Sequence, residues 1–120
     1  MANEITVQAS IQVVNGNLRD SFSVGSKTYD QAAVGGPTPG FVTIGTTEEE
    51  VALAELSSKG WVMMQNLDAT NYVEWGGSTG VYCGRMRAGE TAGPFRLNNT
   101  SLFLRANTAA CKVLIKAYEA

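Results

Sequence analysis

The chain has 120 residues, a length that accommodates one domain over residues 1–120 and no second one. Nine basic and eleven acidic side chains give a formal net charge of −2 without any basic run, so we expect no nucleic-acid partner. Histidine is absent, which excludes mechanisms that use imidazole as a base, a proton shuttle or a metal ligand, and we expect no metal and no cofactor.

The N-terminal segment alternates strictly between apolar and polar residues. From Glu4 to Val14 every second residue is apolar, which predicts a strand with one buried face; these residues are Ile5, Val7, Ala9, Ile11 and Val13. Asn15-Gly16 is a favoured pair for a type I′ turn, and the alternation resumes after it with Leu18, Phe22 and Val24. We therefore predict a β-hairpin over residues 4–25.

The next stretch contains a turn-forming cluster. A short strand is expected between Lys27 and Val34 and another between Phe41 and Ile44. The cluster between them cannot belong to a central strand, because proline donates no hydrogen bond and glycine lowers order, so we predict a surface loop. This loop consists of Gly35, Gly36, Pro37, Thr38, Pro39 and Gly40.

Residues 47–58 admit two interpretations. Thr47 precedes Glu50 by the spacing of a capping box, ahead of an apolar run that begins at Val51, which favours one short helix. The same residues can also be divided between the two faces of an edge strand. We favour the helix and keep the edge strand as the alternative.

Strand-like segments follow one another at regular spacing after Gly60. Turn residues separate them, a pattern typical of an all-β sandwich or barrel. We predict strands over residues 61–67, 71–75, 80–87, 94–97, 101–106 and 110–118. Cys83 and Cys111 fall on two of these strands among alternating apolar neighbours, so we expect both thiols to be reduced and buried.

No residue set in the chain points to catalysis. Asp68, Glu74 and Glu90 supply the carboxylates that glycoside hydrolysis needs, but each lies beside a turn, where acidic side chains normally face water. We therefore expect no enzymatic activity. The longest apolar runs hold only a few residues, such as Val113 to Ile115, so neither a signal peptide nor a membrane span is expected.

Three sequence stretches carry a resemblance to a known group of proteins. They are NLDATNYVE (66–74), RMRAGE (85–90) and PFRL (94–97). In this order they resemble small all-β structural proteins of tailed bacteriophage virions. The resemblance implies a single β-sandwich that is jelly-roll-like, forms a homo-oligomer, most often a trimer, and is synthesised in the host cytoplasm before it joins the virion. It supplies a strand frame and no catalytic residues.

Two hypotheses for function follow from this resemblance. The first is a capsid cement or decoration protein that binds the major capsid protein or other virion proteins at subunit junctions. The second is a tail or fibre component that binds a host glycan, with Tyr72, Trp75 and Phe95 as stacking residues. For the partner interface we name the N-terminal residues Met1, Ala2, Asn3 and Glu4, the loop from Gly35 to Gly40, and Trp75, because an aromatic residue at a strand end marks many interfaces.

Overall fold

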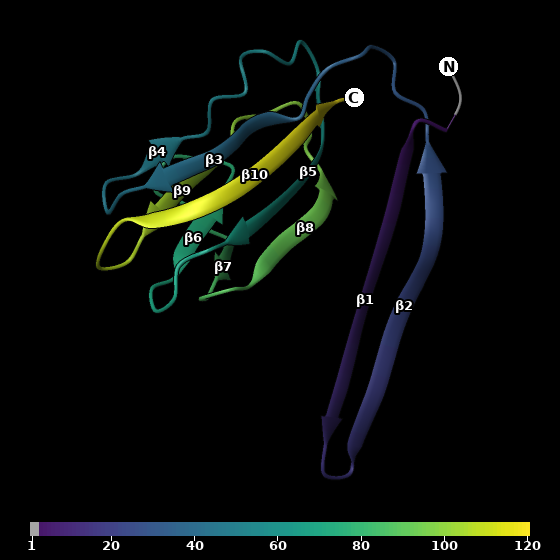
Figure 1. Cartoon of the computed structure of the whole chain (residues 1–120), viewed down its shortest axis with the longest axis vertical. Coiled ribbons are helices and arrows are strands. Elements are labelled where there is room, and N and C mark those ends of the chain that lie inside the picture. The colour runs from purple at the N-terminus through teal and green to yellow at the C-terminus, as the bar shows by residue number, and fades with distance from the viewer. Residues whose placement is uncertain (1–2) are drawn as a thin grey trace. The chain divides into compact units, whose positions relative to one another are not determined.

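The protein is built entirely from antiparallel β-strands. Its structure is a computed structural model that describes residues 3–120, and within these residues there are ten strands and no helix (Figure 1). The strands are β1 (Ile5–Asn15), β2 (Leu18–Tyr29), β3 (Thr38–Ile44), β4 (Glu49–Glu50), β5 (Lys59–Asn66), β6 (Val73–Gly76), β7 (Gly84–Met86), β8 (Thr91–Arg96), β9 (Phe103–Ala106) and β10 (Cys111–Glu119). The all-β prediction is confirmed.

The chain forms two compact units, one ending at Ala32 and the other comprising Ala33–Ala120. The first unit is the hairpin of β1 and β2, which confirms the predicted hairpin. Its turn lies one residue later than predicted, because Asn15 pairs with Leu18 and leaves Gly16 and Asn17 as the central residues. Gly16 has a φ of 58° and Asn17 does not have a positive φ, as in a type II′ turn rather than type I′.

The alternating apolar face of the hairpin is not covered by the hairpin itself. Ile11 is 63% exposed and its cross-strand partner Phe22 is 66% exposed. At the other end of the hairpin Ile5 and Val7 are partly buried. The alternation thus predicts which residues share a face, but the hairpin by itself does not bury that face.

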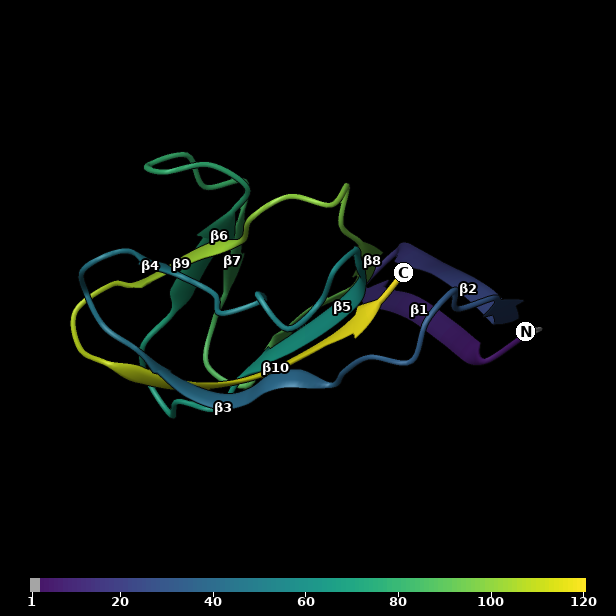
Figure 2. The same cartoon turned by 90° about the horizontal axis from the view of Figure 1, so that it is seen from above.

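The second unit consists of two four-stranded sheets. One has the order β3-β10-β5-β8 and the other the order β4-β9-β6-β7, and they form the two layers seen in Figure 2. In this unit the first strand in the sequence pairs with the last, the second with the second to last, and so on. The pairs are β3 with β10, β4 with β9, β5 with β8, and β6 with β7. Two further pairings, β10 with β5 and β6 with β9, join these ribbons side by side.

Both sheets contribute to one hydrophobic core. Because side chains alternate between the faces of a strand, every second residue of β10 points into this core, and these residues are Cys111, Val113, Ile115 and Ala117. Facing positions come from the other strands and include Met64, Val73, Met86 and Leu104, each at most 1% exposed. The core is thus formed by inward positions that the period-two pattern identifies.

The helix predicted within residues 47–58 is wrong. Glu49 and Glu50 form the short strand β4 with Leu104 and Phe103, and the Val51 amide then donates to the Leu102 carbonyl. Val51 and Leu53 are buried on alternate positions, as the edge-strand alternative required. The chain extends because these apolar side chains reach the core only from an extended backbone, which outweighs the local capping signal.

Part of the predicted loop from Gly35 to Gly40 is also wrong. Thr38, Pro39 and Gly40 belong to β3 and pair with β10. Proline is tolerated there because β3 is the outermost strand of its sheet, where one side of the strand needs no ladder hydrogen bonds. The strand expected between Lys27 and Val34 does not exist separately, since β2 continues through Lys27 to Tyr29.

The two cysteines occupy different environments. Both are free thiols; Cys111 is fully buried, and burial raises the pKa of its thiol. Cys83 is exposed, so the expectation that it is buried is wrong. It follows Tyr82 after β6 has ended, in a segment outside the regular strands, where alternation no longer predicts burial.

We predict that Cys111→Ala lowers the free energy of unfolding by about 1 to 3 kcal/mol, because it removes a side chain from the closed core. Cys83→Ala is the matched control and should change it by less than about 0.5 kcal/mol. Urea denaturation of both variants measures the difference. Equal losses for the two variants would contradict the assigned environments.

Candidate interaction surfaces

The described N-terminal residues fasten the open end of the hairpin. The Asn3 amide donates to the Asp30 carboxylate at 2.8 Å, and the Gln31 amide donates to Glu4 at 3.0 Å. The Thr28 hydroxyl donates to the Asn3 side chain at 3.0 Å. Two of the predicted interface residues, Asn3 and Glu4, therefore hold the ends of β1 and β2 together, and Met1 and Ala2 lie outside the described residues.

The segment from Gly35 to Pro37 runs along the C-terminal end of β10. The Glu119 amide donates to the Gly35 carbonyl at 3.2 Å. Gly36 has a φ of 91°, and a side chain there would meet the Ala117 carbonyl oxygen at 2.5 Å, so only glycine fits. Pro37 and Gly36 are exposed. These two residues are the part of the predicted loop whose surface is open to a partner.

Trp75 closes one end of the core. Its ring stacks on Phe95 with centroids 5.2 Å apart and covers Gly84, where a Cβ atom would lie 2.5 Å from the ring. The side chain is half-buried and packs against core residues. Its role in binding a partner stays a prediction.

The structure does not bring the predicted interface residues of the second unit together. Gly35 to Gly40 lie at the β3 edge of one sheet. Trp75 lies in the other sheet and contacts Phe95 of β8, at the opposite edge of the first sheet. A single partner surface that touches both would have to span the width of this sheet.

The stretch from Asn66 to Glu74 begins with a buried hydrogen-bonding centre. The Asn66 side chain is fully buried; its amide nitrogen donates to the carbonyls of Asn71 at 2.8 Å and Met86 at 3.1 Å, and its oxygen accepts from the Asp68 amide at 3.0 Å. The Asp68 carboxylate in turn accepts hydrogen bonds from the Thr70 and Asn71 amides. These two bonds lower the pKa of the carboxyl, and the bond from Asn71 has the larger effect. The residues of this stretch hold the β5–β6 turn.

The acidic residues considered for catalysis have separate local partners. Glu74 forms an ion pair with Arg105 at 2.9 Å, and Glu90 accepts from the Arg87 amide at 2.8 Å. Asp68 is held in the turn described above. The structure does not arrange these carboxylates as a facing pair.

A polar cluster that was not predicted from the sequence lies on the outer side of the β4-β9-β6-β7 sheet. Glu48 accepts hydrogen bonds from the Tyr82 hydroxyl and from the Gly80 amide, the latter at 2.7 Å. The hydrogen bond from Tyr82 is the main cause of the lowered pKa of the Glu48 carboxyl. The pKa of the Tyr82 hydroxyl is raised, mainly by burial and to a smaller extent by its bond to Glu48. The Arg105 guanidinium lies 4.7 Å from the Tyr82 ring. This cluster fastens the β6–β7 loop, and no sequence motif marks it.

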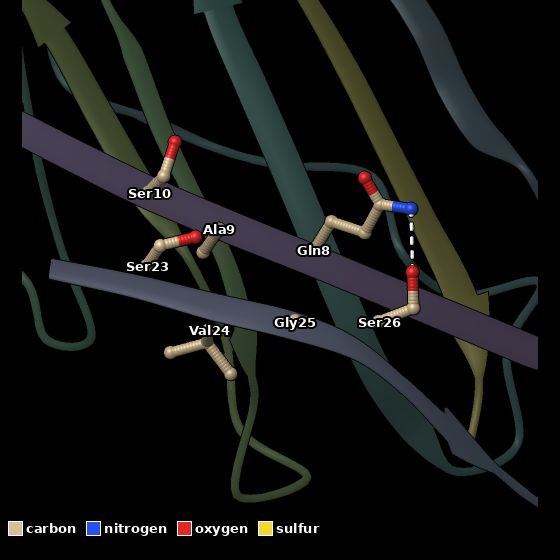
Figure 3. A pocket seen from close by; sticks show the side chains of 7 residues that line it. All are labelled: Gln8, Ala9, Ser10, Ser23, Val24, Gly25 and Ser26. Carbon is tan, nitrogen blue, oxygen red and sulfur yellow. Dashed lines mark hydrogen bonds between the residues drawn. The ribbon is translucent and has the colours of Figure 1, made fainter.

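The register of β1 and β2 shifts between Val7 and Ala9. Beside this irregularity the hairpin has a hollow of about 430 Å³, lined by small and polar residues (Figure 3). Gln8 donates to the Ser26 hydroxyl at 2.6 Å across it. The lining offers hydroxyls and one amide and no ionisable group.

Within residues 3–120, no three or more Cys, Asp or Glu side chains lie close enough together to hold a metal ion. The same part of the chain has no helix long and apolar enough to cross a membrane.

The chain was compared with protein-family models, curated proteins and solved structures. No protein-family model, no curated protein and no solved structure matches the chain.

The C-terminal end of β10 receives a polar clamp from the segment before β5. Glu119 is 5% exposed and accepts from the Ser57 hydroxyl and from the Ser58 amide, the latter at 3.2 Å. The Ser57 bond is the main cause of the lowered pKa of Glu119. This clamp holds the irregular segment 51–58 against the end of the sheet.

We predict that Asn66→Ala lowers the free energy of unfolding by about 2 to 4 kcal/mol, because buried carbonyls and an amide lose their partners. Asn98→Ala, at an exposed asparagine, is the control and should stay within about 0.5 kcal/mol. Thermal and urea unfolding measure both. A loss for Asn66→Ala no larger than the control would show that the turn does not depend on this side chain.

We predict that Glu119→Gln lowers stability at pH 7, and that its difference from the unmodified protein shrinks in acid. A depressed folded-state pKa stabilises the fold above the unfolded-state value of about 4.3, and this contribution is lost as the pH falls through the folded pKa. Urea denaturation between pH 7 and 3 measures it, with Glu55→Gln, exposed in the same segment, as control. A difference that does not change with pH would contradict the clamp.

Proposed function

We propose that this protein is a non-enzymatic structural protein of a tailed-phage virion, and that it acts as a capsid cement or decoration protein. It binds the major capsid protein or other virion proteins at subunit junctions and is made in the host cytoplasm. The observation that carries this proposal is the uncovered apolar face of the hairpin, with Ile11 63% and Phe22 66% exposed. A face of this kind marks a contact with another protein chain, as a protein that works in an assembly needs.

The strand pairing supports a jelly-roll-like sandwich for the second unit. In a jelly roll, a long antiparallel ribbon of eight strands rolls up so that the first strand pairs with the last, the second with the seventh, and so on inwards. The pairs β3 with β10, β4 with β9, β5 with β8 and β6 with β7 follow this order. This topology is consistent with the phage-like stretches, whose residues hold turns and strand ends in it.

As part of this proposal, we infer that the protein forms a homo-oligomer, with a trimer as the favoured form. The hairpin is two-stranded, and both β1 and β2 are edge strands. Exposed edges and apolar faces are normally paired or covered in natural proteins, and neighbouring copies provide such cover.

The alternative is a tail or fibre component that binds a host glycan through Tyr72, Trp75 and Phe95. The last two stack on each other, and Tyr72 lies 4.0 Å from the Arg85 guanidinium. Since these rings already have partners within the chain, they are less available to stack on a sugar, and we favour the cement function.

We predict that particles lacking this protein assemble but rupture at a lower temperature than complete particles, because a ligand that binds only the assembled shell stabilises it. Heating both kinds of particle and measuring DNA release tests this, and adding back the purified protein should restore the rupture temperature. Equal rupture temperatures together with loss of host adsorption would assign the protein to the tail.

A further inference from the structure

One face of the β1–β2 hairpin is mainly apolar, and we call it the arm face. Its charged members are Lys27, opposite Val7, and Asp20, opposite Val13. Cross-strand pairs such as Ile11 with Phe22 and Ala9 with Val24 point to the same side, since directly opposed residues share a face. The apolar members of the arm face are Ile5, Val7, Ala9, Ile11, Val13, Leu18, Phe22, Val24 and Tyr29. The other side is mainly polar, with pairs such as Ser10 with Ser23.

The hairpin needs cover on this face to be stable. A two-stranded hairpin is marginally stable in water unless its apolar side packs on something. With strands of 11 and 12 residues, the hairpin is about 35 Å long at the usual rise per residue. Such a length of alternating sequence is typical of a surface that is buried in the working state of the protein.

A second uncovered apolar surface lies on the other unit. It is the side of the β3-β10-β5-β8 sheet that faces away from the core, which we call the outer sheet face. Phe41 is 67% exposed there and Met63 46% exposed, with the half-buried Leu114 paired to Phe41. Lys112 and Lys116 stand on the same side of β10. The four strands contain one acidic residue, Glu119, and it is buried in the clamp.

The charges on the two faces are complementary. Asp20 is the one acidic residue within β1 and β2, and it lies on the arm face opposite Val13. Covering the arm face with apolar atoms alone would bury this carboxylate without a partner, which is costly. Lys112 and Lys116 provide cations among the apolar residues of the outer sheet face.

We propose that the arm face of one copy docks on the outer sheet face of a second copy, with Asp20 beside Lys112 or Lys116. One type of contact then covers both apolar faces, whereas packing arm faces against each other leaves the outer sheet face bare. A repeated head-to-tail contact forms a ring when the rotation between copies closes, and a three-fold rotation gives the proposed trimer. This inference deepens the proposed function and rests on its homo-oligomeric part.

Zero-length cross-linking of the full chain tests the contact directly. Chains labelled with ¹⁴N and ¹⁵N are unfolded, mixed in equal amounts, refolded and treated with a carbodiimide, which joins a carboxylate to a nearby amine. We expect peptides that join Asp20 to Lys112 or Lys116 and carry both isotopes. Single-isotope pairs alone would place the arm on its own sheet, a cross-link from Asp20 to Lys27 would indicate paired arms, and the absence of any Asp20 cross-link would also overturn the proposal.

A matched pair of substitutions tests the face. Ile11 and Val14 are both 63% exposed on β1, but Val14 lies on the side away from the arm face. We expect Ile11→Ser to raise the dissociation constant of the oligomer by about 10- to 100-fold and Val14→Ser to change it less than about 3-fold. Light scattering over a concentration series measures this, with circular dichroism confirming the fold. A monomeric unmodified protein, or equal effects of both substitutions, would overturn the proposal.

The two proposals fail in different ways. If the cross-links and the Ile11→Ser effect are found but complete and deficient particles rupture at the same temperature, the arm contact holds and the cement function fails. If the protein raises the rupture temperature as a monomer, the function holds and the arm contact fails.

Discussion

The second unit depends on the complete burial of one side of β10. This strand lies between β3 and β5, and Cys111, Val113, Ile115 and Ala117 on its inner side are fully buried. It is hydrogen-bonded along both edges, so a change in its register would move these side chains to the solvent side and place lysines in the core. The pairing of the first and last strands of this unit is therefore specified by hydrophobic alternation.

The sequence predicts the parts of the fold in which alternation and burial coincide. β5, β9 and β10 lie within one or two residues of their expected bounds, because each has one face in the core. The segment 47–58 was predicted wrongly, since a capping pattern acts locally whereas Val51, Leu53 and Leu56 are held by the core. Cys83 was predicted wrongly because the segment before β7 leaves the sheet, and no residue in the sequence signals where it does so.

The candidate surfaces were less predictable than the fold. Alternation in residues 4–14 identified the residues of the arm face but not that they are uncovered, because a pattern of apolar residues is the same whether its cover comes from its own chain or from another. No sequence pattern indicated the outer sheet face. Phe41 and Met63 are far apart in sequence and become neighbours of the same strand, β10, only through the pairing of three strands.

Pro39 in β3 limits how this protein can polymerise. β3 is the outermost strand of its sheet, and a proline there leaves a missing amide donor in the row of backbone groups that an additional strand would need. Extension of the sheet from copy to copy along this edge, which leads to open-ended fibres, is thereby disfavoured.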